Sequence, residues 1–340
     1  MTTKAGPAIL GLATPSRTEN ERIAGVDLIR LVALFAVVVG HAYTDNQLID
    51  RYLQSWRLPI FFVLSGFFWS QTRTLKSEVS KRTRTLIVPY LIWGVLIGFA
   101  AVAFFGFDPG DTAMSFALGG SYAQRPFTAF WFLTALFAAV VMLRLLDRMP
   151  AYLVWISSAA LLLLNMLVGS YLALVPLSLA TATGAIFFIQ TGRFVAQIHQ
   201  RVSVRLLQIV AVLLIAMCLV TLTMIPGTFY PLEMKRGNFP LLAVVISLIL
   251  SASLVTLGTT IALQRRVGAL VTALAKPSLV VIALHPLLLI AFSGKMPYFL
   301  VPVLAFGVSL LVGLAIVWSP ISQALAGVPR SPLRRKLQTD

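Results

Sequence analysis

Charge and cysteine are both scarce in this sequence of 340 residues. Charged residues make up 11% of the chain, whereas soluble domains average about 25%. The single cysteine, Cys218, excludes a disulfide or a cysteine metal site within one chain. The sequence also lacks HExxH, Walker A and GxSxG motifs, so it carries none of these signatures of zinc proteases, P-loop enzymes or α/β-hydrolases.

Hydrophobic residues make up 59% of the chain, and they fall in runs near the length that crosses a hydrocarbon core of about 30 Å. This pattern predicts an all-α polytopic membrane protein. The second apolar run is short and begins with Arg57 and Pro59, and the fifth and sixth runs are joined by almost no loop, which predicts a tight helical hairpin. We expect about ten transmembrane helices, near 24–43, 56–71, 86–106, 127–146, 152–169, 171–190, 205–225, 239–262, 277–294 and 298–319.

The distribution of lysine and arginine predicts the topology. With a cytoplasmic N-terminus, 20 of the 27 cations lie on the inner side and Arg30 lies within the first span. This asymmetry follows the positive-inside rule, so both termini are expected in the cytoplasm. The net charge of +16 reflects topology and does not indicate nucleic-acid binding, because the cations are spread over short loops. Six cations are expected outside: Arg51, Arg57, Arg125, Lys235, Arg236 and Lys295.

Three segments are expected along the chain. Residues 1–22 are polar and predict a flexible cytoplasmic tail, residues 23–320 form the ten-helix membrane domain, and residues 321–340 form a basic cytoplasmic tail. Carboxylates are nearly absent from the predicted spans, where Asp27 is the only one. A proton-coupled transporter usually needs buried acids, so this scarcity weighs against transport.

The first apolar run contains two ionisable residues, Arg30 and His41. They are eleven positions apart, which on a helix is three turns plus about 20°, so both project from one face and lie about 16 Å apart along the axis. Such residues are costly in a membrane and commonly mark functional sites. The alternative is that Arg30 reaches the lipid headgroups and His41 only marks a helix end.

The loop KSEVSKRTRTLIVP carries several cations and one acid, Glu78. Lys81 and Arg84 share a helix face if the third helix begins early. The charge fits a positive-inside anchor. It also fits a binding site for an anionic ligand entering from the cytoplasm, because lysine and arginine both bind phosphate. Arg82, beside them, belongs to the same candidate group.

Three other residues each have a structural and a functional interpretation. Ser65, next to Gly66, allows close helix packing or lines a substrate path. Trp131 fits the aromatic belt of the outer interface, or a surface on which a sugar or acyl group stacks. His285 precedes Pro286 at a predicted bend and is either a hydrogen-bonded histidine of the bundle or part of a site.

Five segments occur in a characteristic order: GVDLIRLVALFAVVVGH, LPIFFVLSGFF, the basic run before IVPYLIW, FWFLTALF and SLVVIALHPLLL. Together they resemble the membrane-bound acyltransferase 3 family, which O-acylates envelope sugars and related molecules. Arg30 and His41 match its Arg-x10-His pattern. Many members carry two arginines at i and i+3 in the basic loop, whereas the pair here is closer to Lys81 and Arg84, and lysine loses the forked hydrogen bonds.

The resemblance implies that an acyl-CoA, most often acetyl-CoA, binds from the cytoplasm. Asp27 is close enough on the helix to pair with Arg30 and fix its rotamer. His41 acts as general base on an acceptor hydroxyl, or it briefly carries the acyl group. The phosphates of the donor are expected at Lys81, Arg82, Arg84 and Arg30.

The expected function is O-acyltransfer, with an acetyl group passing from acetyl-CoA to a hydroxyl of a cell-envelope glycan or glycolipid. The expected location is a bacterial plasma membrane, with lipids as surroundings and no metal or nucleic acid as partner. Two alternatives remain: a transporter or flippase of a lipid-linked or small substrate, and an acyltransferase of a small secondary metabolite. The acceptor, the acyl chain length and the oligomeric state are not determined by the sequence.

Overall fold

The computed structural model describes residues 24–44, 46–225, 229–261 and 263–331, and within these ranges the chain forms helices and no strand. The all-α fold expected from composition is confirmed. The expected tail at 1–22, and residues 332–340 of the basic tail, lie outside the described residues.

The chain forms fifteen α-helices in the described ranges, most of them joined by short connections. Their bounds are α1 Ala24–Ala42, α2 Gln47–Ile49, α3 Pro59–Phe67, α4 Leu75–Arg82, α5 Val88–Phe105, α6 Pro109–Leu118, α7 Trp131–Leu146, α8 Ala151–Leu172, α9 Ala182–Ile198, α10 Val204–Met224, α11 Leu241–Thr260, α12 Arg265–Ala275, α13 Ser278–Phe292, α14 Leu300–Trp318 and α15 Ser322–Ala326.

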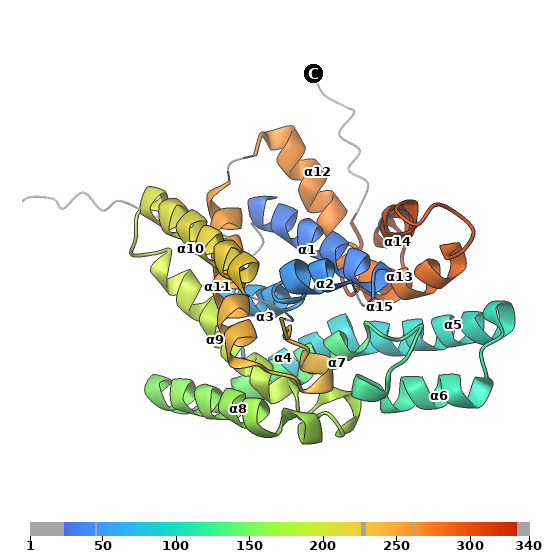
Figure 1. Ribbon diagram of the computed structural model, residues 1–340, viewed down its shortest axis with the longest axis horizontal. Helices are drawn as coiled ribbons and strands as arrows, with labels where there is room; N and C mark the ends of the chain where they lie inside the picture. The colour runs from blue at the N-terminus through green and yellow to red at the C-terminus, as the bar shows by residue number, and fades with distance from the viewer. Residues whose placement is uncertain (1–23, 45, 226–228, 262, 332–340) are drawn as a thin grey trace, which may run out of the picture.

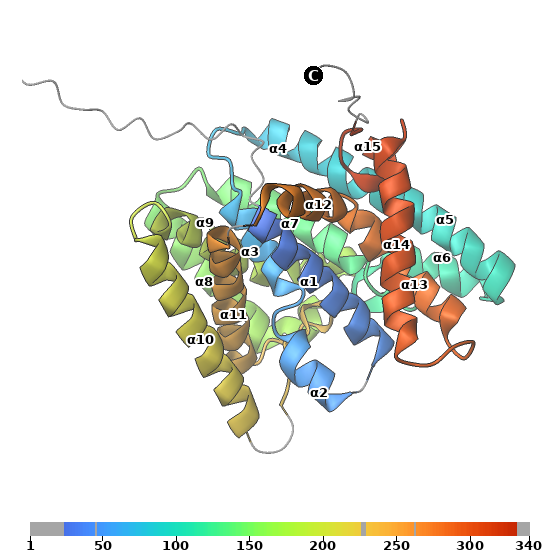
Figure 2. The same ribbon diagram turned by 90° about the horizontal axis from the view of Figure 1, so that it is seen from above.

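Helix α1 runs through the middle of the bundle (Figure 1). Helices α11, α12, α13 and α14 all pack against it, and Figure 2 shows the same central position from above. Because protein surrounds much of α1, the charged Asp27 in its first turn is buried rather than exposed to lipid.

Helices α3 and α9 cross at two glycines that face each other. A Cβ atom on Gly66 would lie 1.8 Å from the backbone oxygen of Ile189, and one on Gly192 would lie 1.9 Å from that of Val63. No larger residue fits at either position without moving a backbone. The close helix approach predicted from the small residues of the second apolar run is therefore confirmed.

Seven helices in the described part of the chain are long and apolar enough to cross a membrane, or eight if α12 and α13 form one span bent by 58°. The expected spans at 56–71 and 127–146 contain shorter helices, α3 and α7, of 9 and 16 residues. The third span begins early, because α4 continues through a π-helical stretch, Thr83–Ile87, into α5. The count of ten and the cytoplasmic termini stay predictions.

Helices α8 and α9 pack against each other as the expected hairpin of the fifth and sixth spans, but the expectation of a tight connection is wrong. Helix α8 ends at Leu172 and α9 begins only at Ala182. The connection contains Pro176, followed by Leu177 and Ser178 with positive φ angles of 60° and 56°. Proline removes a backbone donor and positive φ interrupts a right-handed helix, so the chain cannot continue helically here.

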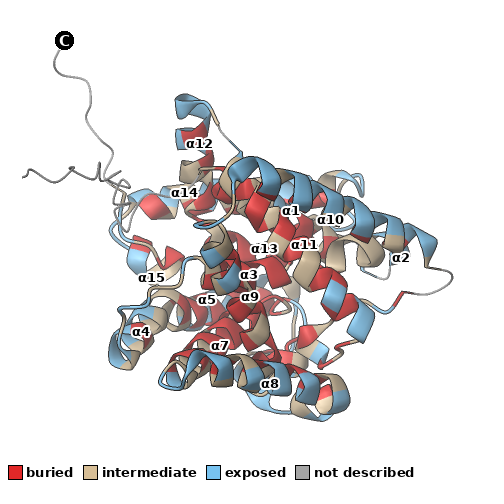
Figure 3. Cartoon of the chain, turned by 90° about the vertical axis from the view of Figure 1, so that its left-hand side faces the viewer, coloured by how far each residue is buried: buried red, intermediate tan, exposed pale blue. Residues whose placement is uncertain are grey.

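Apolar side chains cover the outer surface of the bundle. Helices α8 and α10 lie at its periphery and present many exposed residues, whereas the helices between them are buried (Figure 3). Leu167 on α8 is 72% exposed and Leu213 on α10 is 63% exposed. Exposed leucines of this kind suit contact with lipid tails rather than water, in agreement with a multi-pass membrane protein.

Candidate active site

Two cavities lie at opposite ends of α1. We call them the His41 cavity, of about 210 Å³, and the Arg30 cavity, of about 800 Å³. Helices α3 and α7 provide walls to both, with Pro59 and Trp131 in the His41 cavity and Ser65 in the Arg30 cavity. The predicted site residues are therefore divided between two chambers that share their helices.

A pair of histidines connects α1 to α13 beside the His41 cavity. His41 is in the last turn of α1, and its ring centre lies 5.1 Å from that of the completely buried His285. Pro286 removes the backbone N–H that would otherwise bond the Ile282 carbonyl, a common cause of bends in membrane helices. Ile282 lines the Arg30 cavity, so the histidine pair is about one helical turn from that cavity as well.

The hydrogen bonds of the pair determine which nitrogen of His41 is free. A backbone carbonyl only accepts, so the His285 Nδ1 that lies 2.7 Å from the Val281 oxygen carries a proton. In a neutral His285 the Nε2 is then an acceptor, and it receives the Nδ1–H of His41 across 3.3 Å. The Nε2 of His41 keeps its lone pair, which is the form that a general base or nucleophile needs.

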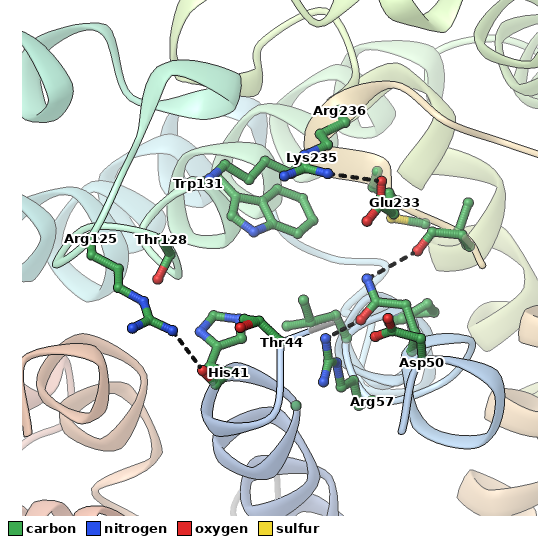
Figure 4. Close-up of a pocket in the computed structure, with 16 residues that line it drawn as sticks. His41, Thr44, Asp50, Arg57, Arg125, Thr128, Trp131, Glu233, Lys235 and Arg236 are labelled. Atoms are coloured by element: carbon green, nitrogen blue, oxygen red, sulfur yellow. Dashed lines mark hydrogen bonds and ion pairs between the residues drawn. The ribbon is translucent and has the colours of Figure 1, made fainter. Parts of the chain in front are cut away.

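The His41 ring lies below the indole of Trp131, with Thr128 and Arg125 beside it (Figure 4). Arg125 donates from Nη2 to the backbone oxygen of His41 across 3.3 Å and so satisfies a carbonyl at the end of α1. Trp131 is 5% exposed and lines the cavity. It is thus a wall of a chamber, a position that suits stacking of a substrate better than an aromatic belt facing lipid.

Arg57 is a second cation of the His41 cavity and, unlike Arg125, it is buried. Its guanidinium lies against α1 at Gly40, where a Cβ atom would be 0.9 Å from Nη1. One nitrogen, Nη2, donates to the side-chain oxygen of Gln54. The Nε and Nη1 atoms donate to no described residue, although Arg57 is only 5% exposed. Sequence reasoning had treated Arg57 as a cation on the outer side only, and no local signal relates it to Gly40.

The segment before α11 forms the opposite wall of the His41 cavity. Lys235 donates from Nζ to the backbone oxygen of Ala123 across 2.5 Å. Arg236 and Glu233 form an exposed ion pair at 3.7 Å. Burial lowers the pKa of the Lys235 ammonium to about 8, with a smaller effect in the same direction from Arg236 and an opposing one from Glu233.

The Arg30 cavity contains the predicted ion pair. Nη1 of Arg30 lies 3.1 Å from Oδ1 of Asp27, so the predicted pairing is confirmed. The predicted Ser65 also lines this cavity, and its hydroxyl donates to the Phe61 carbonyl across 3.0 Å, as serines in membrane helices commonly do. Ser65 therefore lines a cavity, and its contact with a substrate stays a prediction.

The structure separates the three cations predicted to bind a donor. Lys81 and Arg82 line the Arg30 cavity, and Arg82 donates from Nε to Glu78 across 2.8 Å. Arg84 lines an adjoining cavity of about 950 Å³, which Lys81 and Lys276 also line. The two cavities share residues, so together they place cations along one continuous recess.

An ion network that the sequence did not predict supports this recess. Glu78, 1% exposed, receives a hydrogen bond from Arg144 at 3.2 Å, and Arg144 also pairs with Asp147 at 3.2 Å. Arg193 lies 2.6 Å from Asp147, and the guanidinium of Arg144 stacks 4.1 Å above the ring of Trp69. Asp27 is therefore not the only buried carboxylate. The spacing of Arg144 and Asp147 at i and i+3 was the available signal.

The described residues contain no group of three or more histidine, cysteine, aspartate or glutamate side chains that could hold a metal ion. The side chains that line the cavity at His41 include the imidazole, a buried tryptophan and several cations. Such a set suits proton transfer to or from a hydroxyl-bearing substrate.

The fold is that of a multi-pass helical membrane protein with two cavities at opposite ends of α1, one of which His41 lines. Residues 23–321 match the family described as an acyltransferase domain, acyltransferase 3, and the chain belongs to this family. Two similar proteins are both called nodulation protein NolL. The one from Sinorhizobium fredii is 27% identical over 171 residues, covering 46% of this chain and 45% of that protein.

The NolL protein from Mesorhizobium japonicum is 26% identical over 156 residues, covering 42% of this chain and 40% of that protein. The matched region thus spans less than half the length of either curated relative. No solved structure matches the chain significantly.

Proposed function

We propose that the protein is an integral membrane O-acyltransferase that moves an acetyl group from acetyl-CoA to a hydroxyl of a cell-envelope glycan or glycolipid. The observation that carries this proposal is the position of His41. His41 lines the His41 cavity and uses Nδ1 for its bond to His285, which is one turn from the Arg30 cavity, so Nε2 is left for a substrate. A catalytic group between two chambers suits a reaction that joins substrates from two sides.

The donor is assigned to the Arg30 cavity and its adjoining recess. The phosphates of acetyl-CoA would lie among Lys81, Arg84 and Lys276 at the wide end. The thioester end would extend past Ser65 to Ile282, toward the histidine pair. Arg30, held by Asp27, adds a fixed positive charge along this path. Arg82 is held by Glu78 and contributes to the shape and charge of the wall.

The acceptor is assigned to the His41 cavity, with its sugar ring against Trp131. The acceptor oxygen attacks the thioester carbonyl carbon, so a C–O bond forms and the C–S bond breaks. The hydroxyl proton passes to Nε2 of His41 and from there to the CoA sulfur. In the other route, Nε2 attacks the carbonyl carbon first and CoA leaves as a thiolate. The hydroxyl oxygen then takes the acetyl group as the C–N bond to the ring breaks, and its proton passes to the thiolate. His285 holds the tautomer in both routes.

Release of free CoA from acetyl-CoA tests the proposal directly. The purified full chain in detergent should release CoA thiol only when an envelope extract is added, and the acetyl label should appear on extract components. A transporter or flippase would give no acceptor-dependent thiol. Label recovered only on a water-soluble metabolite would favour the acyltransferase of a small secondary metabolite.

The same preparation can test the proposed location and topology. Cys218 is buried, so it leaves a low background for thiol labelling. With the protein in the plasma membrane of intact cells, an impermeant reagent should label a cysteine placed at Asp111, an exposed residue of the segment 107–126 that is expected outside, and should not label one placed at the exposed Ser77. The reverse pattern would contradict cytoplasmic termini.

A further inference from the structure

The His41 cavity has more positive charge than its own carboxylates balance. Four cations and two acids line it, namely Arg57, Arg125, Lys235, Arg236, Asp50 and Glu233. A cavity that binds only a neutral sugar would not need more cations than carboxylates in its lining. Charge inside a small cavity costs desolvation energy unless a partner compensates it.

Among the cations of the His41 cavity, Arg57 most clearly lacks compensation by a carboxylate. It is 5% exposed, and two of its nitrogens, Nε and Nη1, donate to no described residue. Among the described residues its one hydrogen-bond partner is the neutral amide of Gln54, whereas Asp50 and Glu233 attract it only electrostatically. A buried guanidinium without hydrogen-bond partners costs desolvation free energy. The planar group favours forked binding to a carboxylate or a phosphate, which would supply such partners.

Lys235 faces the same chamber from the opposite wall. Its ammonium has a backbone oxygen as neighbour, and burial holds its pKa near 8. A bound anion would restore the charged form by electrostatic attraction. Gly40 directly precedes His41 in the chain and leaves room for the Arg57 guanidinium. An anion held by Arg57 would therefore lie beside the reacting hydroxyl.

We infer that the acceptor is anionic: it carries a phosphate or carboxylate that binds between Arg57 and Lys235, while its hydroxyl faces His41. This inference rests on the proposed function, because it assigns the substrate class of the same site. It distinguishes phosphorylated or acidic glycans and glycolipids from neutral ones.

The test uses the purified full chain in nanodiscs of phosphatidylcholine, with saturating CoA to occupy the cationic recess on the other side. Binding of glucose 6-phosphate, glucuronate and glucose is measured by calorimetry. Both anions should bind at least about tenfold more tightly than glucose, since buried charge pairs are worth several-fold to many-fold in affinity. Equal binding of glucose and the anions would overturn the inference.

Substitutions of single residues test which side chains bind the anion. Arg57→Gln should reduce affinity for both anions about tenfold or more and leave glucose binding unchanged. Arg57→Lys keeps the charge and should recover part of the loss. Lys235→Gln is the second probe, because it lies on a loop and does not depend on the packing of Arg57. Lys295→Gln, an exposed outer cation that lines none of these cavities, is the matched control. Anion binding unchanged in both Arg57→Gln and Lys235→Gln would overturn the assignment.

The anion could come from a sugar or from a lipid headgroup. Replacing part of the phosphatidylcholine by phosphatidylglycerol separates the two sources: displacement of glucose 6-phosphate supports a headgroup as the bound anion, and no displacement supports an acidic glycan. If anions bind through Arg57 but no acceptor-dependent CoA is released, the proposed function fails and the anion site stands. If CoA is released without any preference for anions, the inference alone fails.

Discussion

Buried cations have different partners at the two ends of α1. At the Arg30 cavity, cations meet carboxylates: Asp27 pairs with Arg30, and Glu78 pairs with Arg82 and Arg144. At the His41 cavity, Arg57 has a neutral amide as its hydrogen-bond partner. Compensated pairs fix the shape of a chamber, whereas uncompensated donors are available to a ligand. The comparison therefore assigns a rigid frame to one end and substrate selection to the other.

The largest effect is expected at the junction of the two chambers. His41→Ala should reduce acetyl transfer about 10²–10⁴-fold, as loss of a general base typically does, while the protein still folds and inserts. His199 is a matched control, because its Nδ1 also lies 2.7 Å from a backbone carbonyl, that of Val195, and it lines none of these cavities. Near-normal turnover in His41→Ala at equal expression would exclude this residue as the catalyst.

Under the proposed function, His285 positions His41 through their hydrogen bond, and its loss should have a smaller effect. His285→Ala should lower kcat about 10–100-fold, in the range seen when the partner that orients a functional histidine is removed, with the KM for acetyl-CoA unchanged. His285→Gln offers an amide oxygen to the Nδ1–H of His41 and should recover part of the rate. A rate that falls equally in both variants would indicate a purely structural role.

Gly40→Ala tests whether the Arg57 guanidinium must lie where it does. The new methyl group would overlap Nη1, so the side chain must move while the backbone stays. We expect a loss of about tenfold in affinity for glucose 6-phosphate and little change in thermal stability. Gly307→Ala is the control, since nothing lies within 4 Å of a Cβ atom there. An unchanged affinity in Gly40→Ala would show that this position of Arg57 is not required.

The opposite end is tested by Arg84→Gln, which should weaken binding of a non-hydrolysable acetyl-CoA analogue by a few-fold. The difference from wild type should be larger at low salt than at high salt, because screening already weakens interactions of exposed charges. Lys76→Gln removes an exposed cation of α4 that lines none of these cavities and should bind the analogue normally. Normal donor binding in a correctly inserted Arg84→Gln protein would restrict Arg84 to a topological role.

The smallest effect is expected from pH. Lys235 has a pKa of about 8, so its ammonium is present below that value and is lost above it. Affinity for glucuronate, whose own charge is constant in this window, should therefore fall a few-fold from about pH 7 to about pH 9. Lys235→Gln should remove this dependence. The charged or titratable groups that face Lys235 or the same cavity are His41, Asp50, Arg57, Arg125, Glu233 and Arg236.

Sequence patterns predicted the features that depend on residues close together in the chain. Composition gave the helical membrane class, the spacing of Asp27 and Arg30 predicted their ion pair, and Gly66 predicted a close helix crossing. The pairing of His41 with His285 joins residues 244 positions apart, and apolar periodicity contains no information on which helices meet. Both histidines were singled out, but their contact was not predicted.

The errors have equally specific causes. The second apolar run yields a helix of only nine residues because Pro59 starts it and the chain before it turns through irregular structure. The hairpin between α8 and α9 was misjudged because apolar residues at 173–181 hid a break caused by Pro176. The pairing of Arg144 with Glu78 was not predicted, because the two residues lie in different helices.

The walls of the two chambers also differ in how freely they can change over evolution. Those of the Arg30 cavity are mainly helices, including α3, which is locked to α9 by backbone contact at Gly66. Those of the His41 cavity include two connecting segments, around Arg125 and around Lys235. Connections tolerate insertion and substitution far better than packed helices. If the His41 cavity holds the acceptor as we propose, exchange of these two segments would change acceptor selection while leaving the helices that hold the histidine pair in place.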